Sequence, residues 1–148
     1  VQLALLKAGC YIMPYLDLPK DHRHFKALQK IGATGLLRGE GRNVGWTNQT
    51  WFRADDPLRA EEIFPEGYYN GHLPFPSGPV SVGGFTDALR MLGLRVPKEE
   101  QAWWDSLGLS DYDEDRDVTR LEAAVVIDDL IDPFMMFGVD YYGNVMLY

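Results

Sequence analysis

A short pattern that occurs twice constrains the fold of this chain more than any other feature of its sequence. Residues 56–61, Asp-Pro-Leu-Arg-Ala-Glu, resemble residues 117–122, Asp-Val-Thr-Arg-Leu-Glu, because each places an acid, a helix start, an arginine and a glutamate at the same spacing. A helix is expected to end before each copy, near Gly35-Leu36 and near Gly108-Leu109. A repeated helix–loop–helix unit is the simplest explanation of this recurrence.

Apolar residues at helical spacing predict helices over much of the chain. Phe25, Leu28 and Ile31 recur on one face of a helix that begins after the cap Asp21, and residues 119–122 form a capping box. We also expect helices at residues 1–9, 58–64, 85–92 and 99–107. The predicted fold class is therefore mainly α, a tandem helix–loop–helix bundle with short β-hairpins.

Segments rich in glycine or proline separate these helices. Residues 39–45, Gly-Glu-Gly-Arg-Asn-Val-Gly, do not match the G-x-G-x-x-G fingerprint, so a phosphate cradle and a plain turn both stay open for them. Residues 65–79 predict a long ordered loop or linker between the two halves. Gly143-Asn144 lies between apolar runs, which predicts a hairpin turn near the C-terminal end.

The order of these features resembles S-layer homology (SLH) modules, in which a helix, a Gly-Leu turn, an extended loop with an aromatic residue and an Arg-x-Glu helix start follow one another. The matching stretches are residues 25–28, 35–39, 52, 58–61 and 119–122. Phe25 stands where those modules usually carry Trp, and the second repeat is compressed between Gly108 and Arg120. The resemblance implies an SLH-like bundle.

A second resemblance is more specific. Residues 17–27, 31–35 and 48–52 look like the C-terminal region of a bacterial family of FAD-dependent oxidoreductases, some of which are labelled xanthan lyase. The helix expected at residues 3–9 resembles the last helix of that family's flavin domain. The resemblance implies that FAD belongs to the parent protein. The glycine-rich nucleotide fingerprint is absent from this sequence, so we expect no FAD in this chain alone.

These resemblances set the expected organisation and function. Residues 1–16 would be the terminal helix and connector of a preceding domain, and residues 17–148 an SLH-like domain with repeats at about 17–64 and 81–134. We expect a non-catalytic C-terminal accessory module that packs against the flavin domain of the same polypeptide or attaches to envelope glycan. The alternatives are a domain that completes the active site of the parent flavoenzyme and a calcium-stabilised interaction module.

The charge balance argues against two classes of partner. The 148 residues include 14 Lys and Arg against 22 Asp and Glu, a net charge of −8. Such a balance repels phosphate backbones and anionic lipid surfaces, so we expect no nucleic-acid partner. No stretch approaches the ~18 apolar residues of a membrane span, so we expect no membrane insertion. The single Cys10 fits a reducing compartment, while the overall interpretation favours the periplasm or cell envelope.

Acidic residues before the last expected helix resemble a calcium loop. With Asp111 as position one, acids occupy positions one, three, five, seven and twelve, as in an EF-hand. Position six should be glycine for the sharp turn, and it is Arg116. The alternative is that the acids cap the helix and that Glu122 belongs to the capping box. Calcium therefore stays open, and we assign no metal ligand to the three scattered histidines.

The candidate binding residues come from the SLH resemblance. In those modules the arginine of Arg-x-Glu and an aromatic residue of the first helix line a polysaccharide pocket. This implies a ligand site at Arg59, Arg120 and Phe25, with Trp51 nearby. Packing in the core is the alternative for the aromatic residues, and pairing with carboxylates is the alternative for the arginines. No residue is assigned to catalysis or to cofactor binding, since no G-x-S-x-G motif is present.

Overall fold

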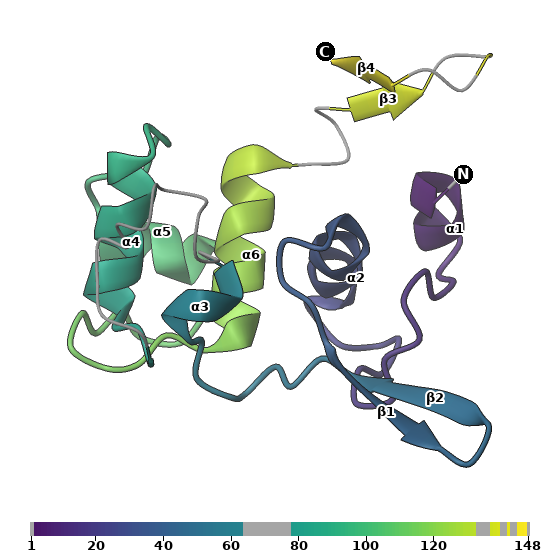
Figure 1. Ribbon diagram of the computed structural model, residues 1–148. Helices are drawn as coiled ribbons and strands as arrows, with labels where there is room; N and C mark the ends of the chain where they lie inside the picture. The colour runs from purple at the N-terminus through teal and green to yellow at the C-terminus, as the bar shows by residue number, and fades with distance from the viewer. Residues whose placement is uncertain (1, 64–77, 133–136, 140–141, 143–144, 148) are drawn as a thin grey trace. The chain divides into compact units, whose positions relative to one another are not determined.

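The computed structural model describes residues 2–63, 78–132, 137–139, 142 and 145–147 (Figure 1). The chain divides into two compact units, which we call the first unit (Val1–Arg53 with Ile127–Tyr148) and the second unit (Ala54–Val126). Residues 65–77 of the predicted linker and the predicted turn at Gly143-Asn144 lie outside the described residues. The predicted division at residue 16 and into two repeats stays a prediction.

The described residues include helices and short antiparallel strands joined by loops (Figure 1). The helices are α1 (Gln2–Lys7), α2 (Phe25–Thr34), α3 (Ala60–Ile63), α4 (Val82–Met91), α5 (Glu100–Ser106) and α6 (Arg120–Ile131). The strands are β1 (Glu40–Val44), β2 (Thr47–Trp51), β3 (Phe137–Val139) and β4 (Val145–Leu147). β1 pairs with β2 and β3 pairs with β4, both antiparallel. In the part of the chain that the structure describes, no helix combines the length and apolar character that crossing a membrane requires.

The predicted fold class, a mainly α SLH-like bundle, is wrong. The described residues combine six helices with two-stranded antiparallel sheets, which is a mixed α and β architecture. Part of the error lies at residues 39–45, which we interpreted as a turn or phosphate cradle. Residues 40–44 form strand β1, and Gly45 begins the turn to β2. The threonines and the tryptophan of β2 favour a strand, and this preference outweighed the glycines of β1.

The core of the first unit is built around α2. Phe25, Leu28 and Ile31 are buried, as their helical spacing predicts. The same helix buries Gln29, whose Oε1 accepts the backbone N–H groups of residues 12 and 13 at 2.7 Å each. Its Nε2 donates to the Met13 carbonyl at 2.9 Å, so the amide fastens the preceding connector to the helix.

The β1–β2 hairpin is fixed at its base. The Leu16 N–H donates to the Thr50 carbonyl at 2.9 Å. The Asp17 carboxylate accepts the N–H groups of Phe52 at 2.7 Å and Arg53 at 2.8 Å. Arg53 has a positive φ of 63°, a conformation that a non-glycine residue adopts at a cost, and the carboxylate holds it there. The base of the hairpin is therefore held against Leu16 and Asp17 of the preceding connector.

Three short segments meet at the centre of the second unit, and we call them the three-segment ring: residues 57–59, 79–81 and 117–119. The Leu58 N–H donates to the Val118 carbonyl at 2.8 Å, and the Val118 N–H donates to the Val80 carbonyl at 2.9 Å. The Val80 N–H donates to the Leu58 carbonyl at 3.1 Å, which closes a cycle. All three side chains are buried, so each segment delivers one apolar residue to the core.

A second cycle of backbone bonds ties the helix starts to the ring. The first residue of each of α3, α4 and α6 donates its N–H to the segment that precedes another of these helices, at 2.8–2.9 Å. The pairs are Ala60 with Gly78, Val82 with Arg116, and Arg120 with Asp56. These bonds satisfy N–H groups that a helix start leaves without an intrahelical partner. Three helices are thus held by one small backbone core.

The ring corrects the predicted alignment of the two sequence copies by one residue. The sequence pairs Arg59 with Arg120, but the ring makes Arg59 equivalent to Thr119 and Arg120 equivalent to Ala60. The alignment followed matching charges, whereas backbone bonding and burial set the true equivalence. A third segment, which holds Val80, completes the ring and carries no charged residue by which the comparison could have found it.

Candidate binding site

The four predicted ligand-binding residues fall into two separate groups. Phe25 and Trp51 belong to the first unit, and Arg59 and Arg120 belong to the second. Phe25 is only 5% exposed and packs edge-on against Tyr11, with ring centroids 5.1 Å apart. A buried ring has no face for a sugar, so the core role considered as the alternative describes Phe25 better.

Each of the two arginines forms an ion pair with a glutamate of α3. Arg59 is exposed, and its Nε donates to Glu61 Oε1 at 3.0 Å. Arg120 is only 4% exposed, and its Nη1 donates to Glu62 Oε1 at 2.5 Å. The other oxygen of Glu62 accepts the Arg59 N–H at 3.0 Å. Glu62, which sequence reasoning missed, therefore connects the starts of α3 and α6, and Arg120 acts as a tie between them.

The strongest polar cluster of the second unit surrounds Glu122. Its carboxylate accepts bonds from both terminal nitrogens of Arg116, at 2.7 and 2.6 Å, and from the Trp104 indole N–H at 2.9 Å. It also accepts the N–H of Thr119 at 3.1 Å, while the Thr119 hydroxyl oxygen accepts the Glu122 N–H at 3.1 Å. The predicted capping box is confirmed. Arg116 and Trp104 were missed, because nothing local in the sequence links them to Glu122.

The electrostatics of this cluster favour ionised groups. Burial by itself raises the pKa of Glu122, but its hydrogen bonds from Arg116, Thr119 and Trp104 outweigh burial and lower the pKa below its usual value. The hydrogen bond to Glu122 raises the pKa of Arg116. The pair is charge-assisted and bidentate, the strongest form of side-chain hydrogen bonding in proteins.

Arg116 also organises the acidic loop that resembles an EF-hand. Its Nη2 donates to the Asp111 carbonyl at 3.1 Å, and its Nη1 donates to the Asp117 carbonyl at 3.2 Å. The loop thus wraps around a guanidinium, and Glu122, the expected bidentate calcium ligand, is bound to it. Within the described residues, no group of three or more His, Cys, Asp or Glu is arranged to hold a metal ion.

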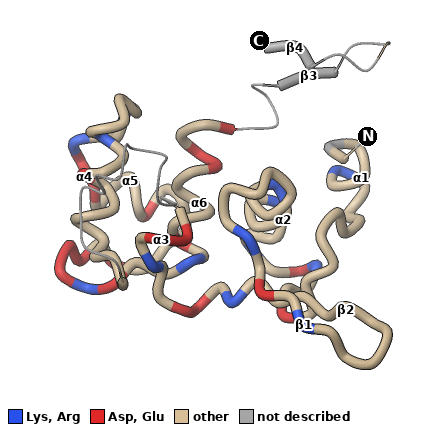
Figure 2. The backbone as a smooth tube through the Cα atoms, viewed as in Figure 1, with Lys and Arg blue, Asp and Glu red and all other residues tan. Residues whose placement is uncertain are grey.

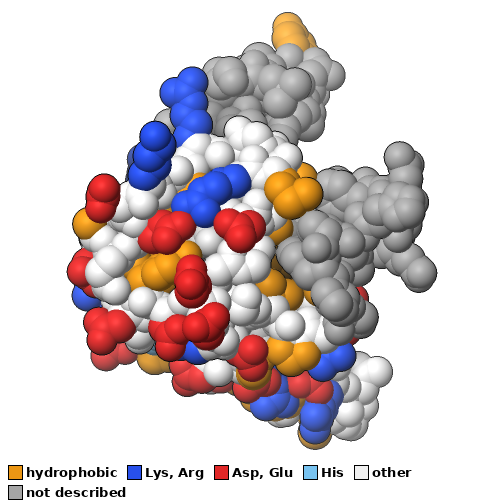
Figure 3. Space-filling model, turned by 90° about the vertical axis from the view of Figure 1, so that its left-hand side faces the viewer, with side chains coloured by type: hydrophobic (Ala, Val, Ile, Leu, Met, Phe, Trp, Pro, Cys, Tyr) orange, Lys and Arg blue, Asp and Glu red, His pale blue; other side chains and the backbone are white. Residues whose placement is uncertain are grey.

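The remaining acids of this loop face solvent. Figure 2 shows acidic residues along the loop that leads to α6, and Figure 3 shows acidic side chains gathered over one face. The exposed members are Asp111, Asp113, Glu114, Asp115 and Asp117. They make the surface of the second unit strongly negative, which opposes anionic ligands.

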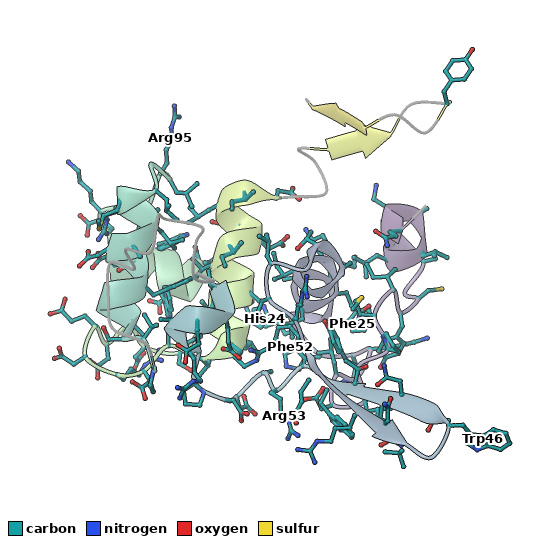
Figure 4. All side chains as sticks on the ribbon, viewed as in Figure 1. His24, Phe25, Trp46, Phe52, Arg53 and Arg95 are labelled. Carbon is teal, nitrogen blue, oxygen red and sulfur yellow. The ribbon has the colours of Figure 1, made fainter. Side chains whose placement is uncertain are left out.

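The β1–β2 hairpin presents the most exposed aromatic residue among the described ones. Its register pairs Val44 with Thr47, so Gly45 and Trp46 form a two-residue turn. Gly45 has a φ of +64°, as a type II′ turn requires of its first central residue, and the Thr47 hydroxyl donates to the Val44 carbonyl at 2.8 Å. The Trp46 side chain is fully exposed and points away from the hairpin tip (Figure 4).

Polar side chains line the hairpin below Trp46. Asn43 pairs with Asn48 across the strands, and Arg42 pairs with Gln49. Trp51 is half-buried, with the Arg42 and Arg53 guanidiniums 6.0 and 5.7 Å from its ring centroid. Because side chains alternate along a strand and cross-strand partners share a face, Arg42, Gln49 and Trp51 lie on one face of the hairpin, and Asn43 and Asn48 lie on the other.

The single carboxylate in residues 39–53 bonds two arginines. Glu40 accepts bonds from the Nε of Arg42 at 3.0 Å and of Arg53 at 2.9 Å. These hydrogen bonds, the one from Arg42 first, lower the pKa of Glu40. Sequence reasoning did not assign Trp46 to a site. A Gly-x pair between two strand-like runs is the signal that would have placed Trp46 at a turn.

Comparison with family models, with curated proteins and with solved structures found no match to this chain.

Proposed function

We propose that this chain is a non-catalytic accessory module that binds a partner through the β1–β2 hairpin. The observation that carries the proposal is Trp46, a fully exposed indole at the tip of a hairpin whose base and turn are both fixed by hydrogen bonds. Exposing a large aromatic side chain to water forgoes the free energy that its burial would provide. A stiff turn that holds it outward suits binding, because little conformational entropy is lost when a ligand covers it.

The second unit supports the same proposal as a scaffold. Its principal charged groups are engaged with one another: Glu122 bonds Arg116, and Glu62 bonds Arg120. A carboxylate whose pKa is lowered by such partners is a poor general acid or base near neutral pH. These ion pairs hold helix starts together, which is a structural task.

The resemblance to FAD-dependent oxidoreductases supplies the proposed setting of the module, a polypeptide that also carries a flavin domain, while the hairpin binds a separate ligand. The rival function is that this module contributes residues to the parent's active site. The two functions differ in what removal of the module does. An accessory module can be removed with flavin content and turnover per bound flavin preserved, whereas a module that completes the site is needed for turnover.

Flavin titration tests the proposal at two levels. The intact 148-residue chain, titrated with FAD, should leave flavin fluorescence unquenched and show no redox turnover. A purified chain that is yellow with bound flavin would contradict this. The parent protein, measured with and without the module, should keep its turnover per flavin. Flavin retained with turnover lost would establish the rival function.

A single substitution tests the role of the hairpin. Trp46→Ala should weaken binding of the ligand that the intact chain holds at the hairpin by about tenfold. Met91→Ala is the matched control, because Met91 is a large apolar residue that is 75% exposed on α4. Equal effects of the two substitutions would show that the hairpin has no special role in binding.

A further inference from the structure

The hairpin combines one aromatic platform with uncharged hydrogen-bonding groups. Trp46 is fully exposed, and Asn43 and Asn48 face each other across the strands just below the turn. Asn48 is exposed and Gln49 is half-exposed. Carboxamides donate and accept hydrogen bonds in equal measure, which matches hydroxyl groups that also do both. An aromatic face provides an apolar surface for the C–H face of a sugar ring.

The charges of the hairpin and of the whole chain restrict the chemical class of the ligand further. Glu40 is the one carboxylate in residues 39–53, and it bonds both Arg42 and Arg53. Glu40 offsets one of the two guanidinium charges, which leaves residues 39–53 with a net charge of about +1, while the whole chain has a net charge of −8. An acidic polymer or an anionic lipid surface is repelled by the net negative charge of the chain and finds little net positive charge at the hairpin to offset that repulsion.

The apolar area is also small. Val44, 49% exposed, is the apolar residue next to Trp46 in β1, and the other exposed residues around the turn are polar or glycine. A stable protein interface buries about 800 Å² on each partner around an apolar centre. One indole among amides and hydroxyls suits a saccharide chain better than such an interface.

We infer that the β1–β2 hairpin binds a neutral saccharide, with Trp46 stacking on a sugar ring and Asn43 and Asn48, which share one face of the hairpin, bonding its hydroxyl groups. This rests on the proposed function, a binding module acting through the hairpin, and names its ligand class. It differs from the site at Arg59, Arg120 and Phe25 that the SLH resemblance implies. The hairpin belongs to the first unit, whereas both of those arginines belong to the second.

The test uses the intact chain and three uncharged probes: cellohexaose, xylohexaose and mannohexaose. Binding is followed by the Trp46 indole N–H resonance and by calorimetry. At least one probe should bind with a Kd of about 1 mM or below. Trp46→Ala should weaken this binding at least about tenfold, which corresponds to about 1.4 kcal/mol. Trp46→Tyr keeps an aromatic face and should stay within about threefold of the native chain.

Controls separate the saccharide from other occupants. Met91→Ala should leave binding unchanged, and oligogalacturonate, the acidic probe, should bind less well than the neutral ones. If no neutral probe binds at about 10 mM, or if Trp46→Ala binds as well as the native chain, the inference is wrong. If Trp46→Ala weakens binding only to vesicles of anionic lipid or to the flavin domain, the assignment of a saccharide as the ligand is wrong. In that case the hairpin keeps its role as a binding element, and the proposed function survives.

Discussion

Glu62 and Glu122 hold equivalent places in the helices that follow two segments of the three-segment ring, yet their surroundings differ. Each accepts the backbone N–H of the residue three positions earlier, Arg59 in one case and Thr119 in the other. Glu122 is 4% exposed and also receives Arg116 and the Trp104 indole, whereas the Glu62 side chain is 32% exposed. The same local motif is a buried centre in α6 and a half-exposed tie in α3.

The difference shows that the sequence of a helix-start motif does not by itself determine how much the motif contributes to the free energy of unfolding. The bond from the cap residue's N–H to the glutamate is common to both sites, whereas the Thr119 hydroxyl completes a capping box in α6. The buried cluster around Glu122 adds charge-assisted bonds that water cannot replace when one partner is lost. What packs around a motif therefore decides whether it can be removed without unfolding the unit.

The largest expected effect is that of Glu122→Ala. This substitution removes the acceptor of the Arg116 guanidinium and of the Trp104 indole, and it should lower the free energy of unfolding by about 3 kcal/mol. Urea unfolding followed by tryptophan fluorescence measures it. Asp115→Ala, an exposed acid of the same loop, is the control and should stay within about 0.5 kcal/mol. Similar losses in the two variants would remove the contrast.

Glu62→Ala should cost less, about 1–2 kcal/mol, chiefly because the buried Arg120 side chain loses a charged acceptor. Arg120→Met places an apolar side chain where the equivalent residues are Ala60 and Val82. The double variant Glu62→Ala/Arg120→Met should therefore be more stable than the sum of the single losses predicts. Strict additivity in this double-mutant cycle would mean that the two side chains do not interact.

Protonation of Glu122 at acid pH should lower the free energy of unfolding. Because its pKa is lowered in the folded state, its contribution is present above the unfolded pKa and is lost as pH falls through the folded pKa. In Glu122→Gln the free energy of unfolding should decrease less steeply as the pH falls. Asp128 has the opposite sign: burial raises its pKa despite the Lys30 ion pair, so its contribution is present below the unfolded pKa and lost as pH rises through the folded pKa.

Asp128→Asn should therefore steepen the loss of stability between neutral pH and about pH 3, in contrast to Glu122→Gln. Both variants are measured by urea unfolding across that range. Parallel pH profiles for the two would show that one of the assigned pKa directions is incorrect.

Arg59→Ala should have a small effect, within about 0.5 kcal/mol, because an exposed ion pair such as Arg59–Glu61 contributes little. Thermal unfolding measures the stability. The same variant should leave any saccharide binding unchanged, since the hairpin is the proposed site. A loss of binding on Arg59→Ala would instead favour the pocket that the SLH resemblance implies.

Calcium should have the smallest effect of all. The Arg116 guanidinium already bonds Glu122 and two carbonyls of the acidic loop. Glu122, the residue expected to bind calcium through both oxygens, is therefore already occupied by an arginine. Millimolar calcium should shift the melting temperature by less than about 1 °C. A larger rise that Asp113→Ala abolishes would favour the calcium-stabilised module.

Local sequence alone determined the features that depend on neighbours along the chain. The buried face of α2 follows from the spacing of Phe25, Leu28 and Ile31, and the capping box of α6 follows from Thr119 and Glu122. Helix periodicity and capping involve residues within about one turn, so a single sequence contains the information they need.

The tertiary structure decided the rest, because the deciding partners lie far apart in sequence. Arg120 and Glu62 are separated by 58 positions, and Trp104 reaches Glu122 across 18. An alignment of the two copies by their charged residues is therefore one residue out of register. The same comparison could not detect the third segment, at Val80. The exposure of Trp46 depends on a turn whose strands pair with each other and whose base is fixed by Asp17. Hydrogen bonds between distant segments have no period or spacing that a sequence displays.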